Sequence, residues 1–285
     1  MKKIFSYLGA ISLILISFMI SEHTASVMKE NDEIMTKINE KYEQYNKEPL
    51  DATIDGNTII PGINGKTVNI EESYKEMKKL GAYNPNYYVY DEIKPDISIT
   101  KTYDKYIISG NKEKNMISLV FLVHDNDDIT NIINITEKQN VKVTFFIDSE
   151  WMQKNNDLTI ALINNNYTIG NLSINLDYEN TEFIWMNNIL KRIGKQKTNY
   201  CYAEIENEAN LKACKNQKNY TIKPNIIIKK YPLQEIKQQI KSGSIIALSV
   251  NEKTNNELEL IINYIKSKGF ILTNLSENLS EKNND

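Results

Sequence analysis

Histidine and cysteine are scarce in this 285-residue chain, which contains two of each. A zinc site and a Ser-His-Asp triad are built from imidazole or thiolate groups, so the sequence offers little material for either. Neither charge sign dominates, because 34 Lys and Arg oppose 37 Asp and Glu and give a formal net charge of -3. That balance provides no general attraction to phosphate backbones, and we expect no nucleic-acid partner.

The remaining composition is that of an ordinary globular protein. Hydrophobic residues make up 41% of the chain and charged residues 25%. These values exclude wholesale disorder, and the length suffices for one large domain or two smaller ones.

Residues 1–26 are predicted to be a signal peptide or a membrane anchor. Lys2 and Lys3 provide a basic start, and residues 5–21 contain no charge. The length of this run lies between that of a secretory apolar region and that of a spanning helix. Residues 24–26 are small but form no clear cleavage motif. Both fates place the rest of the chain outside the cytoplasm, and an uncleaved run would attach it to a membrane.

Residues 27–50 are charged and favour a helix, with Met28, Ile34, Ile38 and Tyr42 at helical spacing. We predict a helical linker, and a helix that binds a partner remains the alternative.

Residues 51–112 are predicted to form a small α+β module in which glycine and proline separate short β-prone runs. A short helix over residues 74–80 would begin at a cap provided by Asn69 or Ser73 and would end at Gly81. The tyrosines at positions 87, 88 and 90 suit either stacking on sugar rings or packing on the next domain.

From residue 113 to 278 the sequence alternates between strand and helix patterns. Residues 117–124 and 141–147 are continuous apolar runs, as expected of strands covered on both faces. Repeated βα units predict an α/β domain with a parallel, (β/α) barrel-like sheet. Residues 279–285 are polar and are predicted to be a frayed tail.

Three segments of this domain carry a family resemblance. They are KVTFFI at residues 142–147, NYTIGN at residues 166–171 and GSIIAL at residues 243–248. In order and spacing they resemble the K-A-T-F-F, G-H-E-I-G-N and G-S-I-I-L-L segments of the polysaccharide deacetylase family, also called NodB-homology or carbohydrate esterase family 4. The resemblance covers roughly residues 116–278 and implies a barrel-like fold and the hydrolysis of acetyl amide bonds in carbohydrates.

Active members of that family hold a divalent metal through one Asp and two His. A second Asp acts as general base and a further His as general acid. The resemblance places the two Asp positions at Leu122 and Val123, the two metal-binding His positions at Leu172 and Leu176, and the acid at Ser249. The Arg that orients the base is replaced as well, because the R-x-P-Y-G motif falls on NYCYA at residues 199–203. We therefore predict no catalytic residue, no metal and no cofactor.

Two functions remain open. The first is an inactive deacetylase-like protein of the cell envelope that binds cell-wall glycan or an envelope protein through the inherited groove. Its candidate binding residues are His124, Asp125, Asn171, Asn175, Tyr202 and Ser249. The alternative is an active metal-dependent carbohydrate N-acetyl deacetylase whose site has moved to His124, Asp125 and Asp127, just beyond a strand end. A solvated loop and capping of the next helix by Asp128 would explain the same carboxylates.

Cys201 and Cys214 are the only cysteines. Outside the cytoplasm they would suit a disulfide that closes a short loop, and two buried free thiols remain the other possibility.

Overall fold

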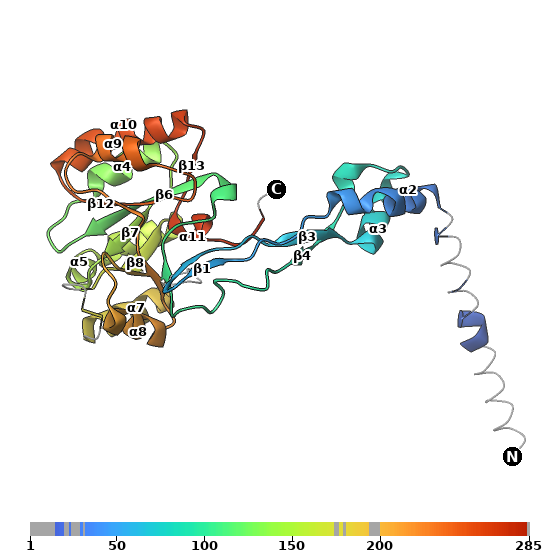
Figure 1. Ribbon diagram of the computed structural model, residues 1–285, viewed down its shortest axis with the longest axis horizontal. Coiled ribbons are helices and arrows are strands. Elements are labelled where there is room, and N and C mark those ends of the chain that lie inside the picture. Colours follow the sequence, from blue (N-terminus) through green and yellow to red (C-terminus); the bar gives the residue numbers. More distant parts are fainter. Residues whose placement is uncertain are drawn as a thin grey trace, which may run out of the picture. The chain divides into compact units, whose positions relative to one another are not determined.

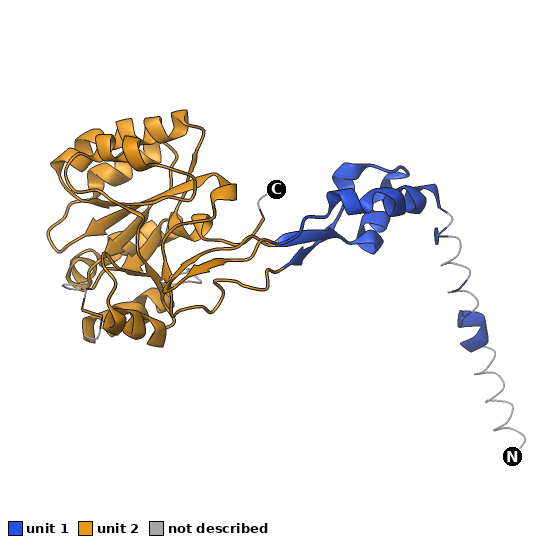
Figure 2. Ribbon diagram, in the orientation of Figure 1, with its two compact units in different colours: residues 1–49, 65–93 blue, residues 50–64, 94–285 orange. Residues whose placement is uncertain are grey.

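The computed structural model describes residues 15–19, 23, 29–30, 32–173, 177–178, 181–193 and 200–283. Two compact units are formed, one by residues 1–49 and 65–93 and the other by residues 50–64 and 94–285 (Figure 2). Most of the predicted signal or anchor segment, residues 1–26, lies outside the described residues. Within the described ranges, no helix combines the length and apolarity needed to cross a membrane.

The division into units differs from the predicted one. Residues 27–50 were expected to be a linker, yet Ile34 and Ile38 are buried in the core of the small unit. Residues 51–112 were expected to be one module, but Ile59 and Ile107 are buried in the large unit and pair there across adjacent strands. Glycine and proline mark where the chain turns, but they do not say which core each strand joins.

The small unit packs two helices beside a two-stranded antiparallel sheet of β3 and β4. The predicted short helix is confirmed, with Asn69 accepting the backbone N–H of Glu72 and Gly81 at φ 75° closing the helix. Tyr88 is buried in this unit's own core, whereas Tyr87 and Tyr90 are exposed. Its elements are α2 (Glu33–Lys41), η1 (Tyr42–Tyr45), β3 (Gly65–Val68), α3 (Ile70–Leu80), η2 (Pro85–Tyr87) and β4 (Tyr90–Ile93).

The large unit is built on a curled, mostly parallel sheet, which confirms the predicted α/β barrel-like class (Figure 1). Among the described residues its strand order is β1-β2-β5-β10-β9-β8-β7-β6-β12-β11, and β13 pairs with β6 off this path. Among the described strand pairs of this sheet, β1 and β2 form an antiparallel hairpin and the others are parallel. The strands are β1 (Thr53–Asp55), β2 (Thr58–Ile60), β5 (Tyr106–Ile107), β6 (Met116–Val123), β7 (Thr144–Ile147), β8 (Thr168–Asn171), β9 (Tyr200–Tyr202), β10 (Tyr220–Ile222), β11 (Ile226–Ile227), β12 (Ile245–Ser249) and β13 (Ile271–Leu272).

Alternate residues of each strand point to opposite faces of the sheet, and both faces are buried. Phe121 and Phe145 pack with the surrounding helices, and Val120 and Phe146 pack inside the curl of the sheet. We call these two sets the helix-side core and the inner core. The helical elements of the large unit are η3 (Lys112–Lys114), α4 (Thr130–Lys138), α5 (Ser149–Lys154), α6 (Asn156–Asn164), α7 (Thr181–Ile193), α8 (Glu208–Asn216), α9 (Pro232–Gln239), α10 (Glu252–Ser267) and α11 (Leu275–Asn278).

The described part of the predicted frayed tail is packed instead. Leu279 belongs to the inner core. The Glu281 carboxylate accepts the backbone N–H groups of Gly62 and Ile99, both at 3.0 Å, and also bonds the Ser98 hydroxyl. A polar composition suggested solvation here, but this carboxylate satisfies buried backbone donors that lie far away in the sequence.

Candidate functional site

The residues predicted to line a groove belong to one edge of the large sheet. His124 follows β6, Asn171 and Tyr202 end β8 and β9, and Ser249 ends β12. Carboxyl ends of parallel strands share an edge, and α/β folds place their sites there. Asn175 lies outside the described residues.

Hydrocarbon side chains occupy the positions that the family resemblance assigns to the metal and the base. Leu122 packs against the inner core, Leu172 is a buried member of it with 2% exposure, and Val123 is buried in the helix-side core. The remaining ligand position, Leu176, lies outside the described residues. Alkyl groups have no lone pair to offer a cation, so these residues do not fit the family's metal.

The register shows how the positions that the resemblance assigns to catalysis meet. Leu122 pairs with Ser249 on one side and with Phe146 on the other. Phe146 in turn pairs with Gly170. A Cβ on Gly170 would collide with the Phe146 ring, so this glycine is required by close packing.

The carboxylates beyond β6 are engaged in local structure. Asp127 accepts the backbone N–H of His124 at 2.8 Å, and its carboxylate lies 3.7 Å from the His124 Nδ1. Asp125 is ion-paired with Lys154. In the part of the chain that the structure describes, no three His, Cys, Asp or Glu side chains are grouped to hold a metal ion.

The predicted capping of α4 by Asp128 is wrong, although Asp128 does contact the start of that helix. The N-cap is Ile129, and the Asp128 carboxylate accepts the N–H of Thr130 at 2.9 Å. Hydrogen bonding with the Thr130 side chain, and then with its backbone N–H, lowers the pKa of Asp128 below its ordinary value.

Sequence reasoning missed Asp148, a buried carboxyl at the same edge. It follows β7 and is the N-cap of α5, where it accepts the N–H of Trp151 at 2.7 Å. Burial raises the pKa of Asp148, while the Trp151 hydrogen bond and the charge of His124 act in the opposite direction. The signal was present in the sequence, because an Asp directly after a strand and before a helix is a common cap.

Asn171 was predicted to face the groove, and the structure instead buries it completely. Its amide donates to the carbonyl of Phe183 at 3.2 Å and to Oδ1 of Asn187 at 3.4 Å, and its Oδ1 accepts the N–H of Ser173 at 2.9 Å. Asn171 thus ties β8 to α7 from within the fold.

Tyr202 lines a pocket of about 390 Å³, which we call the acidic pocket. The ring packs on Phe146 with 5.6 Å between centroids, and the residue is only 1% exposed. The Tyr202 hydroxyl is buried and has no hydrogen-bond partner among the described residues. Burial raises the pKa of this hydroxyl. The lining residues are Asp177, Tyr202, Ala203, Glu204, Ile205, Asn207 and Asn210.

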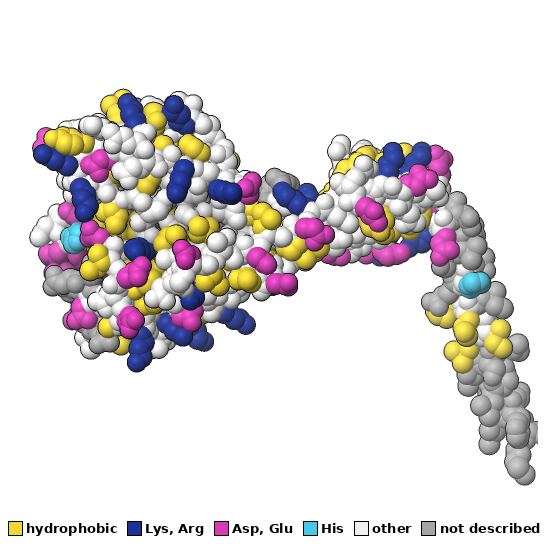
Figure 3. Space-filling view, in the orientation of Figure 1, with side chains coloured by type: hydrophobic (Ala, Val, Ile, Leu, Met, Phe, Trp, Pro, Cys, Tyr) yellow, Lys and Arg dark blue, Asp and Glu magenta, His cyan; other side chains and the backbone are white. Residues whose placement is uncertain are grey.

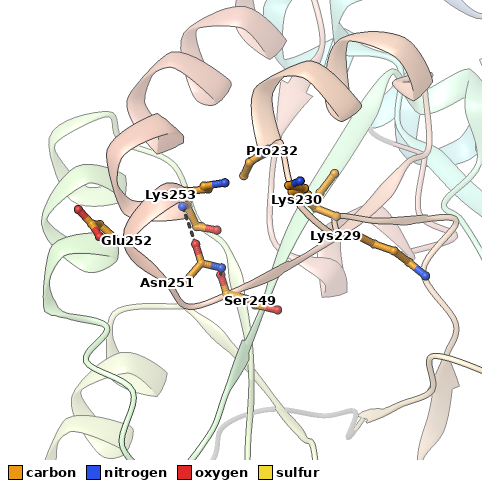
Figure 4. A pocket seen from close by; sticks show the side chains of 9 residues that line it. Lys229, Lys230, Pro232, Ser249, Asn251, Glu252 and Lys253 are labelled. Carbon is orange, nitrogen blue, oxygen red and sulfur yellow. Dashed lines mark hydrogen bonds between the residues drawn. The ribbon is translucent and has the colours of Figure 1, made fainter.

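Ser249 lines a second pocket, of about 310 Å³, which we call the lysine pocket (Figure 4). Ser249 is exposed at the end of β12. The other walls come from the segment after β11 and from the start of α10. The lining residues are Ile228, Lys229, Lys230, Pro232, Ser249, Asn251, Glu252, Lys253 and Thr254.

A disulfide joins Cys201 of β9 to Cys214 of α8, which decides between the two alternatives left open by the sequence. The bridge is buried beside Tyr178 and Phe183. The Tyr178 hydroxyl donates to the carbonyl of Tyr202 at 2.7 Å. These contacts anchor the strand that leads into the acidic pocket.

Residues 109–238 match the family described as polysaccharide deacetylase. This part of the chain resembles a polysaccharide deacetylase domain. The predicted resemblance is thereby confirmed. Among curated proteins, the uncharacterized protein YlxY of Bacillus subtilis is 26% identical in a match that covers 90% of this chain and 87% of YlxY.

Solved structures share the fold. The pseudoenzyme BA3943 of Bacillus anthracis, from carbohydrate esterase family 4, superposes with a TM-score of 0.67 at 24% identity and covers 90% of this chain and 98% of its own. A BA3943 mutant described as having restored enzymatic activity gives 0.66 at 24% identity, covering 88% and 99%. PdaA of Bacillus subtilis, a family 4 carbohydrate esterase, gives 0.54 at 20% identity, covering 63% and 86%. The likeness to BA3943 therefore extends beyond the deacetylase domain.

Proposed function

We propose that this protein is a catalytically inactive polysaccharide deacetylase homologue of the cell envelope that binds wall glycan at the carboxyl edge of its large sheet. The observation that carries the proposal is the replacement of metal and base positions by Leu122, Val123 and Leu172. Alkyl groups neither ligate a cation nor transfer a proton. Burial of Leu172 instead contributes roughly 1.5–3 kcal/mol to folding.

The acidic pocket supports glycan as the ligand. Asp177 and Glu204 provide carboxylate acceptors, and Asn207 and Asn210 provide amide groups. Sugar hydroxyls both donate and accept hydrogen bonds, so this mixture of groups suits a carbohydrate. An envelope protein docking on the same edge is the other partner that we consider. The envelope location rests on the uncharged run of residues 5–21 behind its two lysines.

The alternative of a relocated active site is less well supported. Such a site needs the carboxylates of Asp125 and Asp127 to be available to a cation. Asp125 is instead paired with Lys154, and Asp127 accepts the backbone N–H of His124. Both carboxylates thus have structural partners that a metal would have to displace.

The proposal is tested by two measurements on the full-length protein in mild detergent. Acetate release from chitin oligomers with added zinc, cobalt or manganese should be absent, and calorimetry with chitotetraose should detect binding. Glu204→Gln, which changes one acceptor of the acidic pocket, should weaken that binding. Acetate release that is lost on chelation would overturn the inactivity, and a lack of chitotetraose binding would overturn the glycan ligand.

A further inference from the structure

The lysine pocket concentrates positive charge in a chain whose overall charge is negative. Lys229, Lys230 and Lys253 line it, and in Figure 4 the Glu252 and Lys229 side chains both point away from the amines of Lys230 and Lys253. On the face of the large unit shown in Figure 3, positive and negative side chains are interspersed. The described lining of the acidic pocket, by contrast, includes acidic residues and no basic residue. The two pockets therefore present opposite charge to a ligand.

The lysines of the lysine pocket take part in none of the ion pairs between described residues. Ion pairs of the large unit join other lysines to carboxylates, and among the described residues none includes Lys229, Lys230 or Lys253. The Lys230 and Lys253 Nζ atoms lie 5.1 and 5.0 Å from the centroid of the Tyr231 ring, which is 48% exposed. Two like charges beside one ring repel each other, and a bound anion would relieve that repulsion.

The backbone that presents these lysines is held by Glu235. Its carboxylate accepts the N–H groups of Tyr231 at 2.8 Å, Lys230 at 2.9 Å and Lys229 at 3.1 Å. The Tyr231 hydrogen bond, followed by smaller effects that include the charge of Lys229, keeps the pKa of Glu235 below its ordinary value. Glu235 thus offsets part of the positive charge, but its oxygens are occupied by backbone donors.

The opposite wall adds neutral and dipolar groups. Asn251 caps α10 by accepting the N–H of Thr254 at 2.9 Å, and its amide lies 3.4 Å from the carbonyl of Ser249. The Ser249 side chain stands at the exposed end of β12. The positive end of the 16-residue helix α10 therefore borders the same pocket as the lysines.

We propose that the lysine pocket binds an oxyanion, namely a carboxylate or phosphate group carried by an acidic glycan. The identity of the carrier rests on the proposed function, because the pocket lies on the edge of the sheet assigned to glycan. The anion site itself rests on the unpaired lysines around Tyr231. Neutral glycan would be held at the acidic pocket, and an acidic substituent would be held here.

The test is calorimetric titration of the full-length protein with tetragalacturonate, inorganic phosphate and neutral chitotetraose at low and high salt. Tetragalacturonate or phosphate should bind, and high salt should weaken that binding. The double substitution Lys230→Gln and Lys253→Gln should lower the affinity by about tenfold or more, because charge-assisted hydrogen bonds are lost. Lys241→Gln, which removes one positive charge just beyond the other end of α9, should leave the affinity within about twofold.

The three titrants distinguish the possible sources of the anion. The outcomes also distinguish this inference from the proposed function. Tighter binding of tetragalacturonate indicates a carboxylate glycan, and tighter binding of phosphate indicates a phosphorylated one. Equal affinity of the wild type and the double variant for these anions would overturn the inference. Lysine-dependent binding to anionic phospholipid vesicles without binding of tetragalacturonate or phosphate would overturn the glycan carrier. Chitotetraose binding without anion binding would overturn this inference alone, whereas acetate release would overturn only the proposed function.

Discussion

Leu122 and Ser249 pair in register across strands β6 and β12, at the carboxyl edge of the sheet. These are the positions that the family resemblance gives to the general base and the general acid. Paired residues of adjacent strands present their side chains on the same face, so the register still brings the two positions together. A leucine has no proton to exchange, and a serine hydroxyl does not ionise near neutral pH. The two positions thus meet in register, but their side chains are a hydrocarbon and a neutral hydroxyl.

The packing of Phe146 on Gly170 gives the first prediction. Gly170→Ala places a Cβ against a buried aromatic ring, and overpacking of this kind costs about 1–3 kcal/mol of unfolding free energy. Phe146→Leu makes room, so the double variant should lose less than the sum of the two single losses. Urea denaturation of the four proteins measures this. Strict additivity would show that the two residues do not compete for the same space.

Asp148 gives a prediction on pH. Burial raises the pKa of this carboxyl in the folded state above its unfolded value of about 3.9. The folded state therefore holds the proton more tightly, and stability falls as pH rises from the unfolded pKa through the folded pKa. Asp148→Asn keeps the capping oxygen and removes the ionisation, so its advantage over the wild type should grow across that window. Parallel stability curves for the two proteins would contradict the raised pKa.

The disulfide gives a prediction on redox state. The bridge spans 13 residues between Cys201 and Cys214, and a loop of about that size contributes about 3 kcal/mol. The double variant Cys201→Ala and Cys214→Ala should lose roughly that amount. Dithiothreitol should lower the wild type to a similar stability and leave the variant unchanged, as followed by denaturation. A wild type that is insensitive to the reductant would argue for free thiols.

The Tyr202 hydroxyl, which has no partner among the described residues, gives one prediction on stability and another on binding. A buried hydroxyl without a partner costs about 1–3 kcal/mol, so Tyr202→Phe should leave stability unchanged or raise it. The same substitution should weaken chitotetraose binding if a sugar hydroxyl meets this group in the acidic pocket. Denaturation and calorimetry on one variant provide both values. A loss of stability would show that the hydroxyl is satisfied in solution, and unchanged affinity would remove Tyr202 from the binding site.

Much of the deacetylase domain was predictable from local sequence. The apolar runs predicted its buried strands β6 and β7, and in the small unit Asn69 and Gly81 marked the ends of α3. These features depend on residues that are neighbours in the sequence, which is why periodicity and capping patterns detect them.

The missed features depend on contacts between distant residues. The burial of Asn171 depends on α7, and the order at Glu281 depends on Gly62 and Ile99. The lysine pocket requires Lys230 and Lys253 to meet beside Tyr231, although they are far apart in the sequence. No local pattern specifies these pairings, so they became visible only in the folded chain.

The central claim is that the domain no longer performs metal-dependent deacetylation. Its most direct test is acetate release by the full-length protein from chitin oligomers with zinc, cobalt or manganese, alongside His124→Ala. We predict no acetate above the protein-free control with any metal, for the wild type and the variant alike. Release by the wild type that disappears in His124→Ala would contradict this account and would establish the relocated site beyond β6.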